Sequence, residues 1–170
     1  MKRAFLVSSA ILLAGCSAKY STNNIQERTE HLVKDVSVVI SQPTDGVYET
    51  HTYSGSGRAT ADAVKAAFLR HSDNVTVFAD CDDVTCLKAN HSISRGYYVV
   101  PQILHWEDRA TEWSGIPDKI EVKITVYNAE SNNRVASTII NGKSKWATFG
   151  GDHPQDLLPE PINMFVSNLY

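Results

Sequence analysis

The sequence predicts a single-domain α/β fold, a β-α-β-α-β-β-β-α sandwich in which helices pack on a mixed sheet. Residues 119–127 alternate between apolar and polar side chains, which is typical of a strand with one wet face. Residues 58–71 and 159–170 instead repeat apolar side chains at helical spacing. A chain of 170 residues with 42% hydrophobic content can bury one core, and this composition argues against disorder.

The order of elements follows from these patterns and from β-branched runs bounded by turn residues. The expected strands are residues 32–40, 74–79, 97–106, 119–127 and 135–146, and the expected helices are residues 58–71, 83–95 and 159–170. A polar loop over 41–57 precedes the first helix, for which Ser54 or Ser56 is the expected cap. Gly96 is the expected left-handed end of the second helix.

The N-terminus has the pattern of an export signal. Lys2 and Arg3 precede a largely apolar run over 4–14, which is shorter than the roughly twenty residues of a membrane span. The quartet Leu13-Ala14-Gly15-Cys16 resembles the lipobox of bacterial lipoproteins. That resemblance implies cleavage after residue 15 and covalent lipid on the Cys16 thiol. The alternative is a soluble secreted protein in which Cys16 is incidental.

The segment after the signal sets the expected location. Ser17 follows the lipidated position, and the lipoprotein pattern reserves inner-membrane retention mainly for Asp there, so the resemblance implies an outer-membrane anchor with the domain facing the periplasm. Residues 16–31 are polar and without periodicity, so we expect the lipidated cysteine and a tether there, followed by one periplasmic domain over 32–170.

Cys81 and Cys86 are the remaining cysteines once Cys16 is acylated, and an oxidising periplasm favours a disulfide between them. A continuous helix would hold their α-carbons too far apart, so Cys81 should end a strand and Cys86 should lie in the first turn of a helix capped by Asp82 or Asp83. A zinc site or a redox pair is the weaker alternative, because zinc motifs usually bring two such pairs and redox cysteines are usually closer together.

Residues 105–115 are the segment that packing explains least, and an enzyme site is one interpretation. His105, Glu107, Asp108 and Glu112 offer acid–base or metal chemistry that His153 could complete. Strand alternation, however, sends His105 and Glu107 to one face and Asp108 to the other. No nucleophile elbow and no H-E-x-x-H motif supports catalysis. We therefore assign no catalytic residue, no metal and no cofactor beyond the lipid on the cysteine.

Two further interpretations of this segment stay open. In the first, it is an interaction surface in which tryptophans beside an arginine form a protein hot spot or a sugar-stacking platform. Its residues would be Trp106, Glu107, Asp108, Arg109, Glu112, Trp113 and His153. In the second, Trp106 fills the core at the end of a strand and Arg109 pairs with a neighbouring carboxylate of Glu107, Asp108 or Glu112.

The stretch Gly55-Ser56-Gly57-Arg58 precedes a helix and could cradle an anion on free backbone amides. It lacks the spacing of a P-loop and does not match G-x-G-x-x-G. A flexible loop with a helix cap is therefore the preferred interpretation.

Three blocks of the sequence carry a family resemblance. Residues 98–109, 113–115 and 148–158, including Trp113-Ser114-Gly115, look like the signature of an uncharacterised family of bacterial envelope lipoproteins, the domain of unknown function 4823 type. The resemblance spans most of the mature chain, but the loop over 43–57 carries none of it. It implies a membrane-anchored envelope lipoprotein and brings no reaction, substrate or catalytic residue with it.

The expected function is a non-enzymatic accessory or protein-interaction module of the cell envelope, bound to the outer membrane by lipid and to an envelope protein by its domain. The alternative is a cell-wall glycan-binding or hydrolytic domain that uses residues 105–113. Lys and Arg number 16 against 19 Asp and Glu, and this mild acidity argues against nucleic acid as a partner.

Overall fold

A six-stranded mixed sheet with strand order β1-β8-β7-β6-β2-β5 forms the body of the structure, a computed structural model that describes residues 18–109, 116–145 and 153–170. The sheet strands are β1 (Lys19–Gln26), β2 (Ser37–Ser41), β5 (Val75–Phe78), β6 (Gly96–Glu107), β7 (Lys119–Asn128) and β8 (Arg134–Lys143). Strand β2 pairs in parallel with β5 and β6, and the other pairs are antiparallel.

The remaining elements are three α-helices, one 3₁₀ turn and a short hairpin. They are α1 (Ser56–Phe68), α2 (Val84–Asn90), α4 (Pro159–Leu169), η1 (Pro154–Leu157), β3 (Val47–Tyr48) and β4 (His51–Thr52). This arrangement confirms the predicted mixed α/β sandwich in one domain. Over the described ranges, no helix has the length and apolar content needed to cross a membrane.

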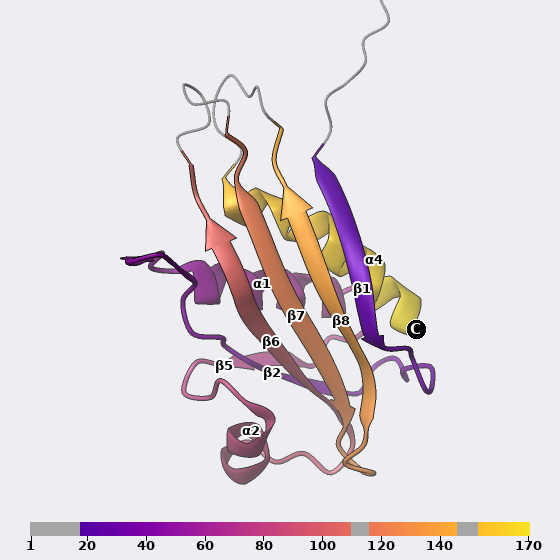
Figure 1. Cartoon of the computed structure of the whole chain (residues 1–170). Helices are drawn as coiled ribbons and strands as arrows, with labels where there is room; N and C mark the ends of the chain where they lie inside the picture. The colour runs from indigo at the N-terminus through magenta and orange to yellow at the C-terminus, as the bar shows by residue number, and fades with distance from the viewer. Residues whose placement is uncertain (1–17, 110–115, 146–152) are drawn as a thin grey trace, which may run out of the picture.

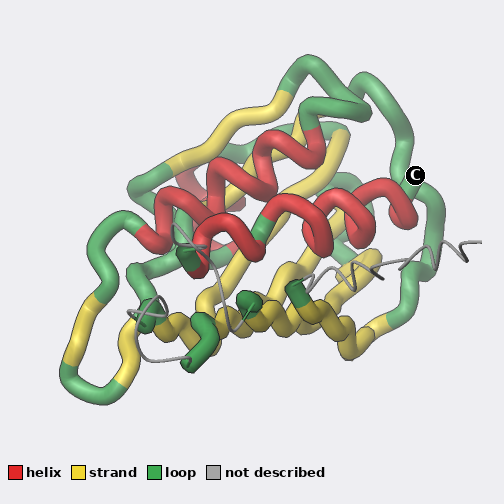
Figure 2. Tube along the Cα trace, turned by 90° about the horizontal axis from the view of Figure 1, so that it is seen from above, coloured by secondary structure: helices red, strands yellow, loops and turns green. Residues whose placement is uncertain are grey.

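The helices divide between the two faces of the sheet. Helices α1 and α4 lie side by side on one face, and α2 lies on the opposite face near one end of the strands (Figure 1). Figure 2 shows α1 and α4 as a layer over the sheet. Alternate strand residues serve the two sides: Val38 and Ile40 join the larger core under α1 and α4, while Val39 joins a smaller cluster with Leu87 of α2. We call the face that carries α2 the outer face.

The predicted periodicities correspond to buried positions. In α1, Ala61, Val64 and Phe68 are fully buried. In β7, alternate residues from Ile120 to Val126 are buried in the larger core, and Glu121 and Lys123 between them are more accessible, whereas Thr125 is 4% exposed. Burial of one stripe of the helix and one face of the strand explains why the residue pattern predicted both elements.

The expected polar tether over 16–31 is wrong for its central part. Residues Lys19–Gln26 form β1, an edge strand that pairs antiparallel with β8 and shifts register between Asn24 and Gln26. Its side chains are mostly polar and exposed because one edge and much of its surface face solvent, so the apolar alternation that marks a buried strand is missing.

The expected second helix is too long. Helix α2 ends at Asn90, and Gly96 instead begins β6 with a φ of 122°. An added Cβ at Gly96 would lie 2.0 Å from the carbonyl oxygen of Ser37 in the neighbouring strand, so this position requires a glycine for close strand approach. The positive φ of Gly96 was predicted correctly, but Gly96 begins a strand of the sheet and does not end the helix.

The start of α1 has a cap that neither predicted serine provides. The carboxylate of Asp45 accepts hydrogen bonds from the backbone N–H groups of Gly55 (3.1 Å) and Gly57 (2.8 Å). The Ser56 hydroxyl accepts one from the Gly46 N–H at 2.8 Å. The amides that could have bound an external anion are therefore occupied by a carboxylate of the same chain.

Candidate functional site

A β-bulge positions the residues at the end of β6. The pairing register with β7 shifts between Ile103 and His105, so Leu104 is an extra residue on the β6 side. After the bulge, His105 and Glu107 lie on the outer face, as the predicted alternation requires, and Trp106 turns into the core. The bulge sets these directions, because a shift of one residue exchanges the two faces of a strand.

Glu107 is the centre of an ion-paired cluster on the outer face. Its side chain is 2% exposed, and its carboxylate accepts hydrogen bonds from the Arg109 guanidinium and contacts the His105 Nε2 at 3.1 Å. The Lys119 Nζ, directly across the strand pair, lies 3.4 Å from the same carboxylate. Both carboxylate oxygens are thus engaged by basic side chains.

These partners keep Glu107 ionised in spite of its burial. Burial by itself raises the pKa of the Glu107 carboxyl, but hydrogen bonds from His105 and Arg109 and the charge of Lys119 outweigh it, so the pKa lies below its ordinary value. The same contact with Glu107 raises the pKa of Arg109. The Glu107 carboxylate is therefore ionised at neutral pH.

Tyr48 of the short hairpin completes the cluster. Its hydroxyl lies 3.4 Å from the Arg109 Nη2, and the guanidinium carbon of Arg109 lies 5.5 Å from the centre of the Tyr48 ring. The same ring meets His105 edge-on at 5.0 Å. Sequence reasoning missed Tyr48, because the loop over 41–57 carries no periodicity that would place it beside the end of β6.

Trp106 is a core residue. It is 3% exposed and packs with Ile120 and the other residues of the larger core. An added Cβ at Gly46 would lie 2.5 Å from the Trp106 Cβ, so the loop closes over the indole because position 46 has no side chain. Trp106 and Glu107 are therefore both buried, and Arg109 pairs with Glu107, as the structural interpretation expects.

Asp118 is a second buried carboxylate that sequence reasoning missed. It accepts a hydrogen bond from the Arg109 backbone N–H at 2.6 Å, and its own N–H donates to the Ser144 hydroxyl at 2.9 Å. Burial raises the pKa of Asp118, and the charge of nearby Asp108 adds to this increase. Asp118 thus joins the ends of β6, β7 and β8. Its position just after Pro117 and just before an alternating strand was the available signal.

Asp108 and His153 meet on the helix side of the same sheet end. The His153 Nδ1 lies 3.9 Å from an Asp108 carboxylate oxygen, and both side chains are exposed. Together with Trp106 they line a hollow of about 510 Å³, bounded also by the segment from His51 to Ala59. The His153 N–H donates to the Asp156 carboxylate at 2.9 Å, which fixes the start of η1. Of the predicted interaction surface, Asp108 and His153 thus have exposed side chains at this sheet end.

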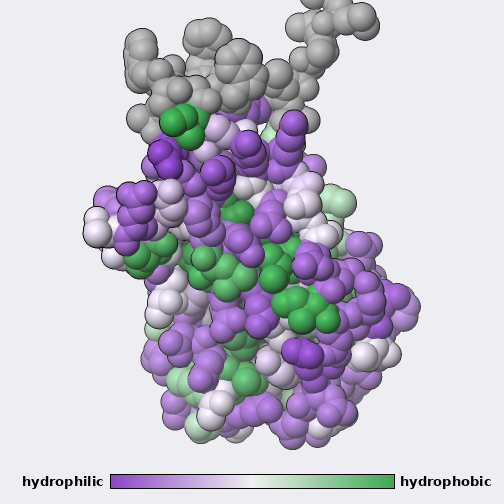
Figure 3. Space-filling view, viewed as in Figure 1, coloured by the Kyte–Doolittle hydropathy of each residue, from purple (hydrophilic) through white to green (hydrophobic). Residues whose placement is uncertain are grey.

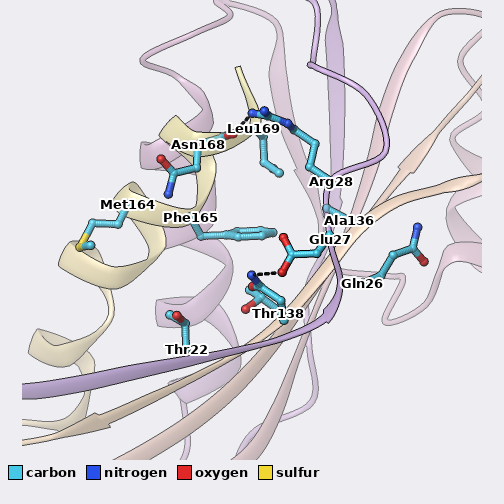
Figure 4. A pocket seen from close by; sticks show the side chains of 11 residues that line it. Thr22, Gln26, Glu27, Arg28, Ala136, Thr138, Met164, Phe165, Asn168 and Leu169 are labelled. Carbon is cyan, nitrogen blue, oxygen red and sulfur yellow. Dashed lines mark hydrogen bonds between the residues drawn. The ribbon is translucent and has the colours of Figure 1, made fainter.

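A separate groove of about 420 Å³ lies between the edge strand β1 and helix α4. Figure 4 shows Phe165 extending from α4 toward β1, and Arg28 donating a hydrogen bond to the Asn168 carbonyl. Glu27 accepts a bond from Asn24 at 2.9 Å. None of the predicted site residues that the structure describes lines this groove, and its polar groups bond both to each other and to Asn23 and Arg134 beside it.

The predicted disulfide joins Cys81 to Cys86 with a Cα–Cα distance of 5.4 Å. As expected, the Asp83 carboxylate caps the following helix and accepts a bond from the Cys86 N–H at 2.7 Å. Asp80 and His91, which lie on either side of the disulfide in the sequence, are joined by a hydrogen bond of 2.9 Å between the His91 Nε2 and the Asp80 carboxylate. Among the described residues, Asp80, Cys81 and His91 form the group with metal-ligand spacing, but the Cys81 sulfur is committed to the disulfide.

Three predicted residues, Cys16, Glu112 and Trp113, lie outside the described residues. The convergence of Glu112 with His105 and Glu107, which the enzyme interpretation needs, therefore stays a prediction. Within the described part, the carboxylate of Glu107 binds basic side chains with both oxygens, and what the arrangement offers chemically is fixed charge and anchored loops.

The fold and this sheet end define a small α/β sandwich domain whose strand ends are held together by buried carboxylates. The chain belongs to the family described as Domain of unknown function (DUF4823), whose model matches residues 30–169. This match confirms the resemblance found in the sequence blocks. No curated protein matches the chain.

Solved structures with the same fold include PelC from Paraburkholderia phytofirmans, described as a dodecamer. The TM-score is 0.66 at 10% identity, with 89% of this chain and 97% of that chain covered. A second PelC dodecamer structure, of a single-residue variant, has a TM-score of 0.62 at 11% identity, over 89% and 97% of the two chains. Lipoprotein GNA1162 from Neisseria meningitidis has a TM-score of 0.38 at 12% identity, over 78% of this chain and 96% of that chain.

Proposed function

We propose that this protein is a lipid-anchored accessory module of the bacterial cell envelope that acts by binding an envelope protein and not by catalysis. In this proposal, Cys16 carries the lipid in the outer membrane and the domain faces the periplasm. The export signal and lipobox over residues 1–16 support the anchor, and the family and the PelC-like fold are compatible with an accessory role.

The observation that carries the binding role is the open outer face of the sheet. Helix α2 covers one end of this face, and Figure 3 shows apolar residues gathered across the middle of the remaining surface. Among the strands of the sheet, the bulge residue Leu104 is 48% exposed, and Ile25 of the edge strand is 45% exposed. An apolar group that a sheet presents to water between polar neighbours is typical of a surface that a partner covers.

The arrangement around Glu107 supports a role without catalysis. A general base needs a free lone pair and a pKa near the working pH. Glu107 instead has a lowered pKa and is engaged by Arg109, Lys119 and His105. Such a network fixes the neighbouring loops in place.

The binding role is tested with a photo-cross-linking amino acid placed at Leu104 in living cells. The matched control is Leu69, which is 43% exposed just beyond the end of α1 on the other side of the sheet. We expect a discrete adduct with one envelope protein from position 104 and none from position 69. Equal adducts from both positions, or none from position 104, would refute a binding role for the outer face.

The anchor is tested by Cys16→Ser, which should release a folded domain from the membrane fraction. Persistence of this variant in the membrane after salt extraction would contradict lipid anchoring.

Because the PelC neighbour is a dodecamer, the molecular mass of the detergent-extracted wild-type protein should also be measured. A partner that proves to be a second copy of this chain would appear there as a defined oligomer.

A further inference from the structure

Three lysines form a continuous row across the outer face at one end of the sheet. Lys119 of β7 is directly opposite Lys143 of β8, and Lys143 is directly opposite Lys19 of β1. Glu107 of β6 extends the row on the other side of Lys119. Residues paired in this way project from the same face with Cβ atoms about 5 Å apart. The row therefore presents three ammonium groups side by side.

Stability of the fold does not account for this row. Like charges directly opposite each other on adjacent strands are destabilising. The charge of Lys119 is balanced by the Glu107 carboxylate, which lies 3.4 Å from the Lys119 Nζ. Neither Lys19 nor Lys143 forms an ion pair with any other described residue. Glu121, one position further along the same face, is the carboxylate that shares their hollow.

The lysines surround an open hollow that suits an anionic group. It has a volume of about 510 Å³, and His105 and Asn141 line it beside the three lysines. All three lysines are exposed. Two adjacent rows thus contribute positive charge and hydrogen-bond donors to one shallow surface, and Glu121 is the described carboxylate that lines the hollow with them.

The position of the row in the chain indicates what the anion belongs to. Lys19 is the third residue after Cys16, and an extended chain spans at most about 3.6 Å per residue, so the two α-carbons lie within about 11 Å. The polar headgroup region of each leaflet is roughly 5–8 Å thick. A lipid on Cys16 therefore keeps this sheet end at headgroup level. Figure 1 shows that β1 and β7 begin, and β6 and β8 end, at this same end.

We infer that the lysine row, Lys19, Lys119 and Lys143, binds the phosphate groups of anionic phospholipids in the leaflet that holds the anchor. This inference rests on the proposed lipid anchor. Each basic residue close to an anionic leaflet strengthens attachment about fivefold. The acyl chains hold the domain at the membrane, and the lysine row sets which end of the sheet faces it. The apolar middle of the outer face then stands clear of the headgroups and accessible to a partner.

The test uses the mature lipidated protein in vesicles and measures the rate at which an amine-reactive reagent labels each lysine, read by mass spectrometry. Vesicles of phosphatidylcholine alone are compared with vesicles that also contain phosphatidylglycerol. We expect labelling of the row to slow about fivefold with phosphatidylglycerol. Lys34, at the other end of the sheet, and Lys65, on α1, serve as internal controls and should not change. High salt should remove the protection.

A variant separates lipid binding from a structural role. Lys143→Gln removes the central charge and should reduce the phosphatidylglycerol-dependent protection of Lys19 and Lys119. Because it also relieves repulsion between neighbours, it should leave the melting temperature unchanged or raise it. The matched control, Lys65→Gln, should preserve the protection. A lowered melting temperature with intact protection in Lys143→Gln would instead assign the row a structural role and overturn the inference.

The remaining outcomes are also decisive. Equal labelling in both kinds of vesicle, or equal protection of the control lysines, overturns the inference. Protection by inorganic phosphate with phosphatidylcholine vesicles would show a site for small anions and overturn the membrane assignment. If mass spectrometry finds no acyl chain on Cys16, the anchor fails. Low-salt sedimentation of that protein with phosphatidylglycerol vesicles then tests the lysine row by itself, and absence of binding refutes it.

Discussion

Replacement of Glu107 by glutamine tests whether the buried carboxylate holds the sheet end together. Glutamine preserves the shape of the side chain but removes the negative charge that Arg109 and Lys119 pair with. Hydrogen bonds to a charged group contribute about 1.5–3 kcal/mol each when buried. The Arg109 and Lys119 side chains are 35% and 46% exposed, which places each contact at or below the lower end of that range.

The expected loss for Glu107→Gln is therefore about 2 kcal/mol of unfolding free energy at pH 7. For a domain of this size, this corresponds to a decrease in melting temperature of about 4–8 °C. The pKa of Glu107 is lowered in the folded state from an ordinary value of 4.5. Its stabilising contribution is thus complete above that pH and is lost as the pH falls through the lower folded-state pKa.

The assay is urea unfolding of the wild type and the variant between pH 7 and pH 3. The difference in unfolding free energy between the two proteins should shrink as the pH falls below 4.5. Glu121→Gln is the matched control, because Glu121 lies on the same face near the same sheet end and forms no ion pair with the described residues. Equal stability of Glu107→Gln and wild type at pH 7, or a difference that is independent of pH, would refute the reasoning.

Substitutions at three further sites test the supports of the fold. Replacing both cysteines of the disulfide by serine should lower the unfolding free energy by about 2 kcal/mol relative to the oxidised wild type, measured by chemical denaturation. Reduced wild type is the control and should be as stable as the variant. Gly46→Ala should cost about 1–3 kcal/mol, because the new methyl group would overlap Trp106, and tryptophan fluorescence should report a changed environment. Asp45→Ala should cost about 1 kcal/mol in thermal unfolding by leaving two amides at the start of α1 without an acceptor, whereas Asp45→Asn should retain much of the cap.

The sequence predicted those parts of the fold that burial imposes on local residue order. The stripe of α1 that includes Val64 and Phe68 and the alternation along β7 were visible because each element buries one side. The edge strand β1 was not visible, since its partner β8 lies far away in the chain and its own side chains are mostly polar. Pairing through backbone hydrogen bonds leaves no signal in residue type.

The candidate site was predictable only as far as alternation extends. The shared face of His105 and Glu107 followed from a period of two, and so did their separation from Asp108. The bulge at Leu104 determines which of these residues is buried, and the local residue pattern did not predict the bulge. Tyr48 enters the cluster through a hairpin in a loop without periodicity, so its contact with Arg109 required the three-dimensional structure.

The pairing of β1 with β8 has a consequence for how the protein is made. Gln26 and Arg134, which hydrogen-bond at the end of this pair, are separated by 108 residues. The first strand to be synthesised therefore pairs only after the last strand of the sheet is available, and contacts between such distant segments form slowly. Until then, the exposed polar segment that becomes β1 has no strand to pair with, and β8 is an open sheet edge.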